Sequence, residues 1–100
     1  MEIVEYKGTK NDLVIGIVNR WTVSDIDKTV TITLHKVSKG FEISQWAMDS
    51  DGNDLEDYRM STTPFKKKYY AMQEVIGMLK KYNPDYGKKK PYVKKPYRKK

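Results

Sequence analysis

Aromatic and basic side chains are the residues of this 100-residue chain whose types best suit binding chemistry. The sequence holds eight tyrosines, two tryptophans, two phenylalanines and twenty lysines and arginines. Rings stack on unpaired nucleobases and lysines neutralise phosphates, so this composition is typical of proteins that bind single-stranded nucleic acid. Trp46 is the best stacking candidate on a strand. Trp21, Tyr6 and Tyr58 are weaker candidates, since a core or rim position explains them as well.

The clearest charge signal lies in residues 87–100, GKKKPYVKKPYRKK, which hold eight basic residues and no acidic one. Residues 1–86 hold the other twelve basic residues and all thirteen acidic ones. The prolines and repelling lysines predict an extended, disordered tail, and each tail tyrosine follows a proline among lysines. A solubilising tail or an anchor for an anionic membrane surface is the alternative. The tail residues expected to contact nucleic acid are Lys88, Lys89, Lys90, Tyr92, Lys94, Lys95, Tyr97 and Arg98.

Further cations are expected to hold phosphates beside the stacking residues. Lys36 and Lys39 flank a predicted hairpin loop, and Arg59 lies on the next predicted strand. Lys66, Lys67 and Lys68 fall in the expected first turn of a helix, where the helix dipole disfavours cations and a bound phosphate would offset this. A solvated lysine run is the alternative for these three.

The sequence contains no pattern that favours catalysis. His35 is the single histidine, there is no cysteine, and no phosphate loop or nucleophile elbow occurs. The acidic segment beginning at Asp49 matches three ligand spacings of a calcium loop, but Asp54 stands where glycine is required and Met60 where glutamate is required. We therefore expect a hairpin turn there, and a protein that is not an enzyme, with no cofactor, metal or small-molecule substrate.

Short strands and one helix are expected to position these residues. Apolar patterning predicts strands over residues 2–7, 12–21, 29–37, 41–48 and 55–62, with a loop over residues 22–28. Residues 29–37 alternate cleanly, whereas residues 12–21 are apolar on both faces, which indicates a central or interface strand. Thr63 is the expected N-cap, Pro64 the first helical residue, and Asn83 with Pro84 ends the helix. The predicted class is α+β: a curved antiparallel sheet of four to five strands followed by one C-terminal amphipathic helix, within residues 1–86.

Apolar residues of the expected helix recur at steps of four, three, four and three, which places them on one stripe. A stripe of this kind needs a partner, either one face of the sheet or a second copy of the helix across a dimer axis. We expect a homodimer, because a chain of this length buries only a modest core. The expected interface residues are Phe65, Tyr69, Met72, Ile76 and Leu79.

The start of the sequence, MEIVEY, is acidic and has no apolar targeting segment, and no apolar run approaches the roughly 18 residues that span a membrane. A cytoplasmic protein is expected, in the host cell if a phage encodes it.

The stretch GFEISQWAMDSDGNDLEDYRMSTTPF, with Trp46, Met48, Asp49, Gly52 and Thr63-Pro64 in place, resembles the positive cofactor four family of transcriptional coactivators, which is related in fold to the Whirly proteins. The resemblance covers about 40 residues. It implies a curved four-stranded sheet plus helix, a homodimer with packed helices, and binding of single-stranded DNA along the sheet. Small phage-encoded single-strand-binding proteins share this fold.

Two departures from that family pattern bear on function. Ser44 and Gln45 replace the family's basic residues before the turn, and the basic arm is C-terminal instead of N-terminal. These departures favour a sequence-independent, phage-encoded single-stranded-DNA-binding protein of replication or recombination, with RNA or duplex DNA as further candidate ligands. There are two alternatives. One is a transcription coactivator or architectural protein that binds duplex DNA through the tail, and the other is an interaction domain with a solubilising tail.

Overall fold

A five-stranded antiparallel sheet forms the body of the protein in the computed structural model, which describes residues 2–87. The strand order β1-β2-β3-β4-β5 follows the chain, so each neighbouring pair is joined by a local connection. One long helix, α2, follows the last strand, which confirms the predicted α+β class. The strands are β1 (Glu2–Lys7), β2 (Ile17–Ser24), β3 (Lys28–Val37), β4 (Gly40–Asp49) and β5 (Met60–Ser61); the helices are α1 (Lys10–Val14), the 3₁₀ turn η1 (Glu56–Tyr58) and α2 (Lys68–Lys80).

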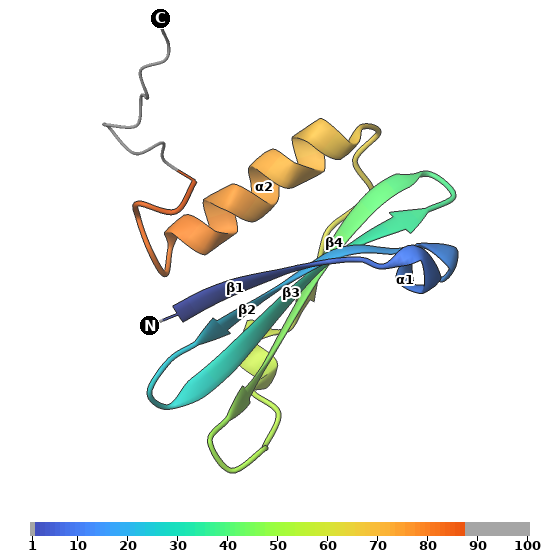
Figure 1. Ribbon diagram of the computed structural model, residues 1–100. Coiled ribbons are helices and arrows are strands. Elements are labelled where there is room, and N and C mark those ends of the chain that lie inside the picture. The colour runs from blue at the N-terminus through green and yellow to red at the C-terminus, as the bar shows by residue number, and fades with distance from the viewer. Residues whose placement is uncertain (1, 88–100) are drawn as a thin grey trace, which may run out of the picture.

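The core lies between α2 and one face of the sheet (Figure 1). Alternation along β3 buries Val30, Ile32 and Leu34 on this face, as the pattern predicts. The helix face that packs on the sheet is not the predicted stripe: it buries residues at spacings of four, three and one, and of the predicted stripe only Leu79 is among them. These helix residues are Ala71, Val75, Met78 and Leu79.

The segment after β1 is a short helix, so the predicted strand over residues 12–21 is wrong in its first half. Thr9 caps α1 in a capping box: the backbone N–H of Asp12 donates to the Thr9 hydroxyl, and Thr9 donates its own backbone N–H to the Asp12 carboxylate. Gly16 then takes a φ of 91°, which turns the chain into β2. Strand β2 continues to Ser24, through part of the predicted loop.

The segment before α2 also differs from the prediction. Residues 55–62 form η1 and a two-residue strand instead of one long strand. Thr62 and Phe65 still pair with β4, because Thr62 N–H donates to Ile43 O at 2.9 Å and Phe65 N–H donates to Phe41 O at 2.7 Å. This pairing holds residues 62–65 extended, so Lys67, not Thr63, is the N-cap of α2.

Candidate nucleic-acid interface

The sheet face opposite α2 is not covered by a helix in the part of the chain that the structure describes (Figure 1). The register aligns its side chains in rows that cross the strands. Most members are threonines and serines, with an aromatic or cationic residue toward each edge. One row runs Tyr6, Arg20, Thr33, Ser44, Ser61, and the next runs Val4, Thr22, Thr31, Trp46.

Trp46 is one of two exposed aromatic residues in these rows of the open face; the other is Tyr6. Trp46 lies opposite Thr31 in the β3–β4 register, and 40% of its surface is exposed, whereas its neighbour Ala47 is fully buried on the helix side. The predicted orientation of Trp46, away from Phe41 and Ile43, agrees with this alternation. A flat ring held at this exposure can stack on a planar ligand.

An open groove of ≈ 540 Å³ runs beside Trp46, along the edge formed by β4 and the segment before α2. Arg59, a predicted phosphate-binding residue, lines this groove together with Trp46, so the fold brings these two residues together. Arg59 forms an exposed ion pair with Asp54, which also lines the groove. The remaining lining residues are Ser44, Gln45, Met60 and Ser61.

Arg20 and Tyr6 form a second cation–aromatic pair at the β1 edge of the open face. The Arg20 guanidinium lies 5.7 Å from the centroid of the Tyr6 ring, and the Tyr6 hydroxyl donates to Asp12 at 2.8 Å. This hydrogen bond raises the pKa of Tyr6. The pKa of Asp12 is lowered, chiefly by the hydrogen bond from the Thr9 N–H and then by the hydrogen bond from the Tyr6 hydroxyl. Sequence reasoning missed Arg20; its position one residue before Trp21, and therefore on the opposite face, was the available signal.

His35 and Ser44 meet on the same face, with 2.9 Å between His35 Nε2 and Ser44 Oγ. Both side chains are half-buried. Residues 2–87 contain no group of three histidine, cysteine, aspartate or glutamate side chains that could hold a metal ion.

The predicted phosphate-binding lysines of the domain gather at one end of the sheet. Lys36 lies on the β3–β4 hairpin with its ammonium 5.3 Å from the Phe41 ring centroid, and Lys39 is exposed in the hairpin turn. The Phe41–Phe65 backbone pairing brings the 66–68 lysine run beside this hairpin. All three lysines of the run are exposed, but only Lys68 lies inside α2, so the expected first-turn position is wrong for Lys66 and Lys67.

Trp21 and Tyr58 are not on the open face. Trp21 is 1% exposed and belongs to the core between the sheet and α2, because it pairs with Ile32 on the covered face. Tyr58 in η1 is half-buried against the same core, with the Lys28 ammonium 5.6 Å from its ring centroid. The prediction of Trp21 as a stacking residue is therefore wrong. The Tyr58 ring already packs against the core and the Lys28 ammonium.

The predicted dimer stripe divides between the core and the surface. Leu79 is fully buried against the chain's own sheet, and Phe65 is half-buried beside Phe41. Tyr69 is 65% exposed, while Met72 and Ile76 are half-buried. Leu79 is therefore wrong as a dimer contact, because it completes the core of a single chain.

The predicted tail contacts, Lys88 to Arg98, lie outside the described residues. Within residues 2–87, no helix has the length and apolar character needed to cross a membrane. In the comparisons with known proteins, no family model, no curated protein and no solved structure matches the chain.

Proposed function

We propose that this protein binds single-stranded DNA along the open face of its sheet, without sequence preference, and serves replication or recombination. The observation that carries the proposal is the groove beside Trp46, where an exposed indole and the Arg59 guanidinium line one open concavity. Bases stack on aromatic rings while cations hold the backbone, and this combination is the usual basis of sequence-independent single-strand binding.

The path of the strand follows from the positions of aromatic and cationic groups. Bases stack on Trp46 at the β4 edge, and the backbone crosses the threonine and serine rows toward Arg20 and Tyr6 near the β1 edge. These edges are three strand spacings apart, about 14 Å, so a few extended nucleotides bridge them. Lys36, Lys39 and the 66–68 lysine run contact phosphates that leave the open face at the hairpin end, and the tail adds further cationic contacts.

The low density of fixed hydrogen-bond donors on this face supports recognition without sequence preference. The central side chains of these rows are short hydroxyl residues. Gln45, which is in register with Ile32 and lines the groove at the sheet edge, already donates its amide to the Tyr58 carbonyl at 2.7 Å. Few side chains remain that reach the edges of successive bases. Stacking and backbone charge therefore supply the affinity in this mechanism.

The test is a fluorescence titration of the full chain with oligo-dT, with a duplex of equal length as the competitor. Trp46 is the exposed tryptophan and Trp21 is the buried one, so quenching should affect only part of the emission. In a Trp46→Phe variant the remaining emission comes from Trp21, and oligo-dT should leave it unchanged. Equal binding to duplex and oligo-dT with no quenching of Trp46 would instead indicate a polyanion-binding protein that does not stack bases.

Homodimerisation through α2 is part of the proposal, through the residues of the stripe that the core leaves accessible. Tyr69 is largely exposed and packs edge-on against Tyr70, with the two ring centroids 5.5 Å apart. Met72 and Ile76 continue the stripe at helical spacing. The exposed aromatic pair supports a helix-to-helix contact, since exposed large apolar residues grouped on one helix face favour association.

A further inference from the structure

The β1–β2 connection ends in an exposed apolar tip. The tip consists of Leu13, Val14 and Ile15, which are 55%, 81% and 71% exposed. The surrounding backbone is held in place: Asp12 and Thr9 close the capping box, and Lys36 N–H donates to Gly16 O at 2.6 Å. Consecutive exposed aliphatic residues on a well-fixed segment of a soluble surface favour contact with a partner.

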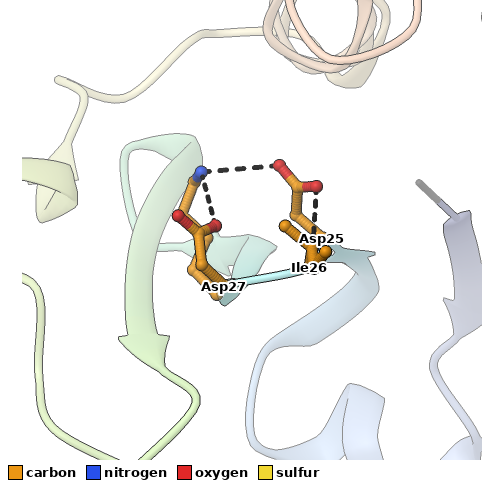
Figure 2. Close-up of polar contacts among 4 residues, drawn as sticks. Asp25, Ile26 and Asp27 are labelled. Carbon is orange, nitrogen blue, oxygen red and sulfur yellow. Dashed lines mark hydrogen bonds and ion pairs between the residues drawn. The ribbon is translucent and has the colours of Figure 1, made fainter.

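Another exposed aliphatic residue lies apart from the tip, at the opposite end of the strands. Ile26 is 94% exposed in the β2–β3 turn between Asp25 and Asp27 (Figure 2). The Asp25 carboxylate accepts the Ile26 N–H at 2.8 Å, and the Lys28 ammonium lies 3.5 Å from Asp25 and 3.4 Å from Asp27. These interactions fix the turn, so Ile26 is presented by an ordered acidic segment.

The charges around these two apolar features are opposite in sign. At the end with the tip, which we name the basic end, seven lysines outnumber two acids; the lysines are Lys7, Lys10, Lys36, Lys39, Lys66, Lys67 and Lys68, and the acids are Asp12 and Glu42. At the end with Ile26, which we name the acidic end, eight acids outnumber four bases. The acids are Glu2, Asp25, Asp27, Asp49, Asp51, Asp54, Glu56 and Asp57, and the bases are Lys28, Arg59 and, at the C-terminal end of α2, Lys80 and Lys81 (Figure 1).

We propose that copies of this chain associate head to tail, with the apolar tip and basic end of one protomer on Ile26 and the acidic end of the next. Two basic ends repel each other, as do two acidic ends, so neither end suits a symmetric contact with itself. A basic end against an acidic end pairs both the charges and the exposed aliphatic residues. Such a contact joins different surfaces, so it propagates into rings or filaments.

The occupant of each end is therefore a second copy of this chain. A bare polyanion would satisfy the lysines of the basic end but would be repelled by the acidic end, leaving Ile26 exposed. The proposal does not depend on base stacking, because Trp46 and the exposed aliphatic residues Val14, Ile15 and Ile26 are separate groups; Asp54 and Arg59 of the acidic end do line the groove beside Trp46.

Sedimentation velocity of the full chain, with no nucleic acid present, tests the contact. At an ionic strength of about 0.01 M, where charges interact over about 30 Å, the average sedimentation coefficient should rise with protein concentration; at about 1 M it should fall back. Replacing both Val14 and Ile15 by glutamine blocks the basic end, and Ile26→Gln blocks the acidic end. Each variant alone should lose concentration-dependent growth, while Val4→Gln, which changes an exposed aliphatic residue on the open face, should retain it.

The decisive measurement mixes the two blocked variants in equal amounts. One intact basic end and one intact acidic end then remain, so the mixture should form a species of two protomers and grow no further. A mixture that behaves as the sum of its components would overturn the head-to-tail contact, as would association that either glutamine variant leaves unchanged. If α2 also dimerises the chain, the sedimentation coefficient of the variant with Val14, Ile15 and Ile26 all replaced by glutamine is the reference value for every comparison.

Discussion

Trp21 and Trp46 project from opposite faces of the same sheet, because Trp21 pairs with Ile32 on the covered face and Trp46 pairs with Thr31 on the open face. The two tryptophans therefore have separable roles. Trp21 is a core residue in contact with the α2 side, and Trp46 lines the groove that we propose binds a base.

Trp46→Ala should weaken binding of oligo-dT by about 1–3 kcal/mol, roughly 5- to 150-fold, because one stacking platform is lost. Its partial exposure means that the free energy of unfolding should change little. Trp21→Ala should lower that free energy by about 3–5 kcal/mol through a core cavity. Fluorescence anisotropy with labelled oligo-dT and urea unfolding measure the two effects. Loss of stability in the Trp46 variant with full affinity would contradict the assignment.

Gly40→Ala should destabilise the protein strongly. Gly40 has a φ of 139°, and an added Cβ would lie 2.0 Å from the Phe65 carbonyl oxygen, in the pairing that ties the β3–β4 hairpin to the start of α2. Conformational strain alone costs about 1–3 kcal/mol, and the clash adds to it. Two matched changes have open space around the new methyl group: Gly52→Ala should cost only the strain of its positive φ, and Gly77→Ala inside α2 should stabilise by about 1 kcal/mol. Thermal and urea unfolding of the three variants give this order.

Stability should fall in acid partly through Asp12. Its folded-state pKa is lowered below the ordinary value of 3.8, chiefly by the Thr9 N–H and then by the Tyr6 hydroxyl. A lowered folded pKa contributes stability that is fully present above the unfolded pKa and is lost as the pH falls through the folded pKa. Asp12→Asn should therefore be less stable than the parent chain at pH 7 and converge with it below the folded pKa. Parallel urea curves across the acid range check this; an equal gap at every pH would contradict it.

Deletion of residues 88–100 should reduce the salt dependence of binding more than it reduces tryptophan quenching. The deleted segment carries eight basic residues. If all eight meet single-stranded phosphates, the slope of log K against log salt should become less negative by about 5.6, taking about 0.7 for each contact. Titrations at several salt concentrations, followed by Trp46 quenching, give the slope for both chains. An unchanged slope would assign the tail a role other than phosphate binding.

The proposed helix contact should depend on Tyr69. Tyr69→Glu places a charge on the exposed part of the α2 stripe without disturbing the core, so it should shift the chain from dimer to monomer. Sedimentation equilibrium at high salt isolates this contact, because high salt suppresses the proposed charge-dependent association of the two ends. Glu74→Gln, a change of one charge at an exposed position about 140° around the helix from Tyr69, is the control.

The alternation of apolar and polar residues made the strands between residues 28 and 49 predictable, because successive side chains of a half-buried strand point alternately to the core and to solvent. The run over residues 12–21 carried apolar residues on both faces from Leu13 to Val18 and showed no such alternation there. Its first part forms the helix α1 because a capping box and a positive-φ glycine decide the local conformation. The same run concealed which face Trp21 occupies.

The start of α2 was mispredicted for a different reason. Thr63 followed by Pro64 is a strong local start signal, but Thr62 and Phe65 pair with β4 on both sides of it. Tertiary hydrogen bonds outweighed local preference and delayed the helix to Lys68. Trp46 and Arg59 were both predicted, but their meeting in one groove depends on how η1 and β5 fold back along β4, which has no pattern in the sequence.

The separation of charge along the strands gives the described part of the molecule an electric dipole moment directed along β3 and β4. These strands are ten residues long, so the lysine-rich and aspartate-rich ends lie about 30 Å apart. In the field of a polyanion, such a body experiences a torque before it makes any contact. For the proposed binding of nucleic acid, we therefore expect the β3–β4 hairpin of the described domain to be turned toward the polyanion before Trp46 comes within reach of a base.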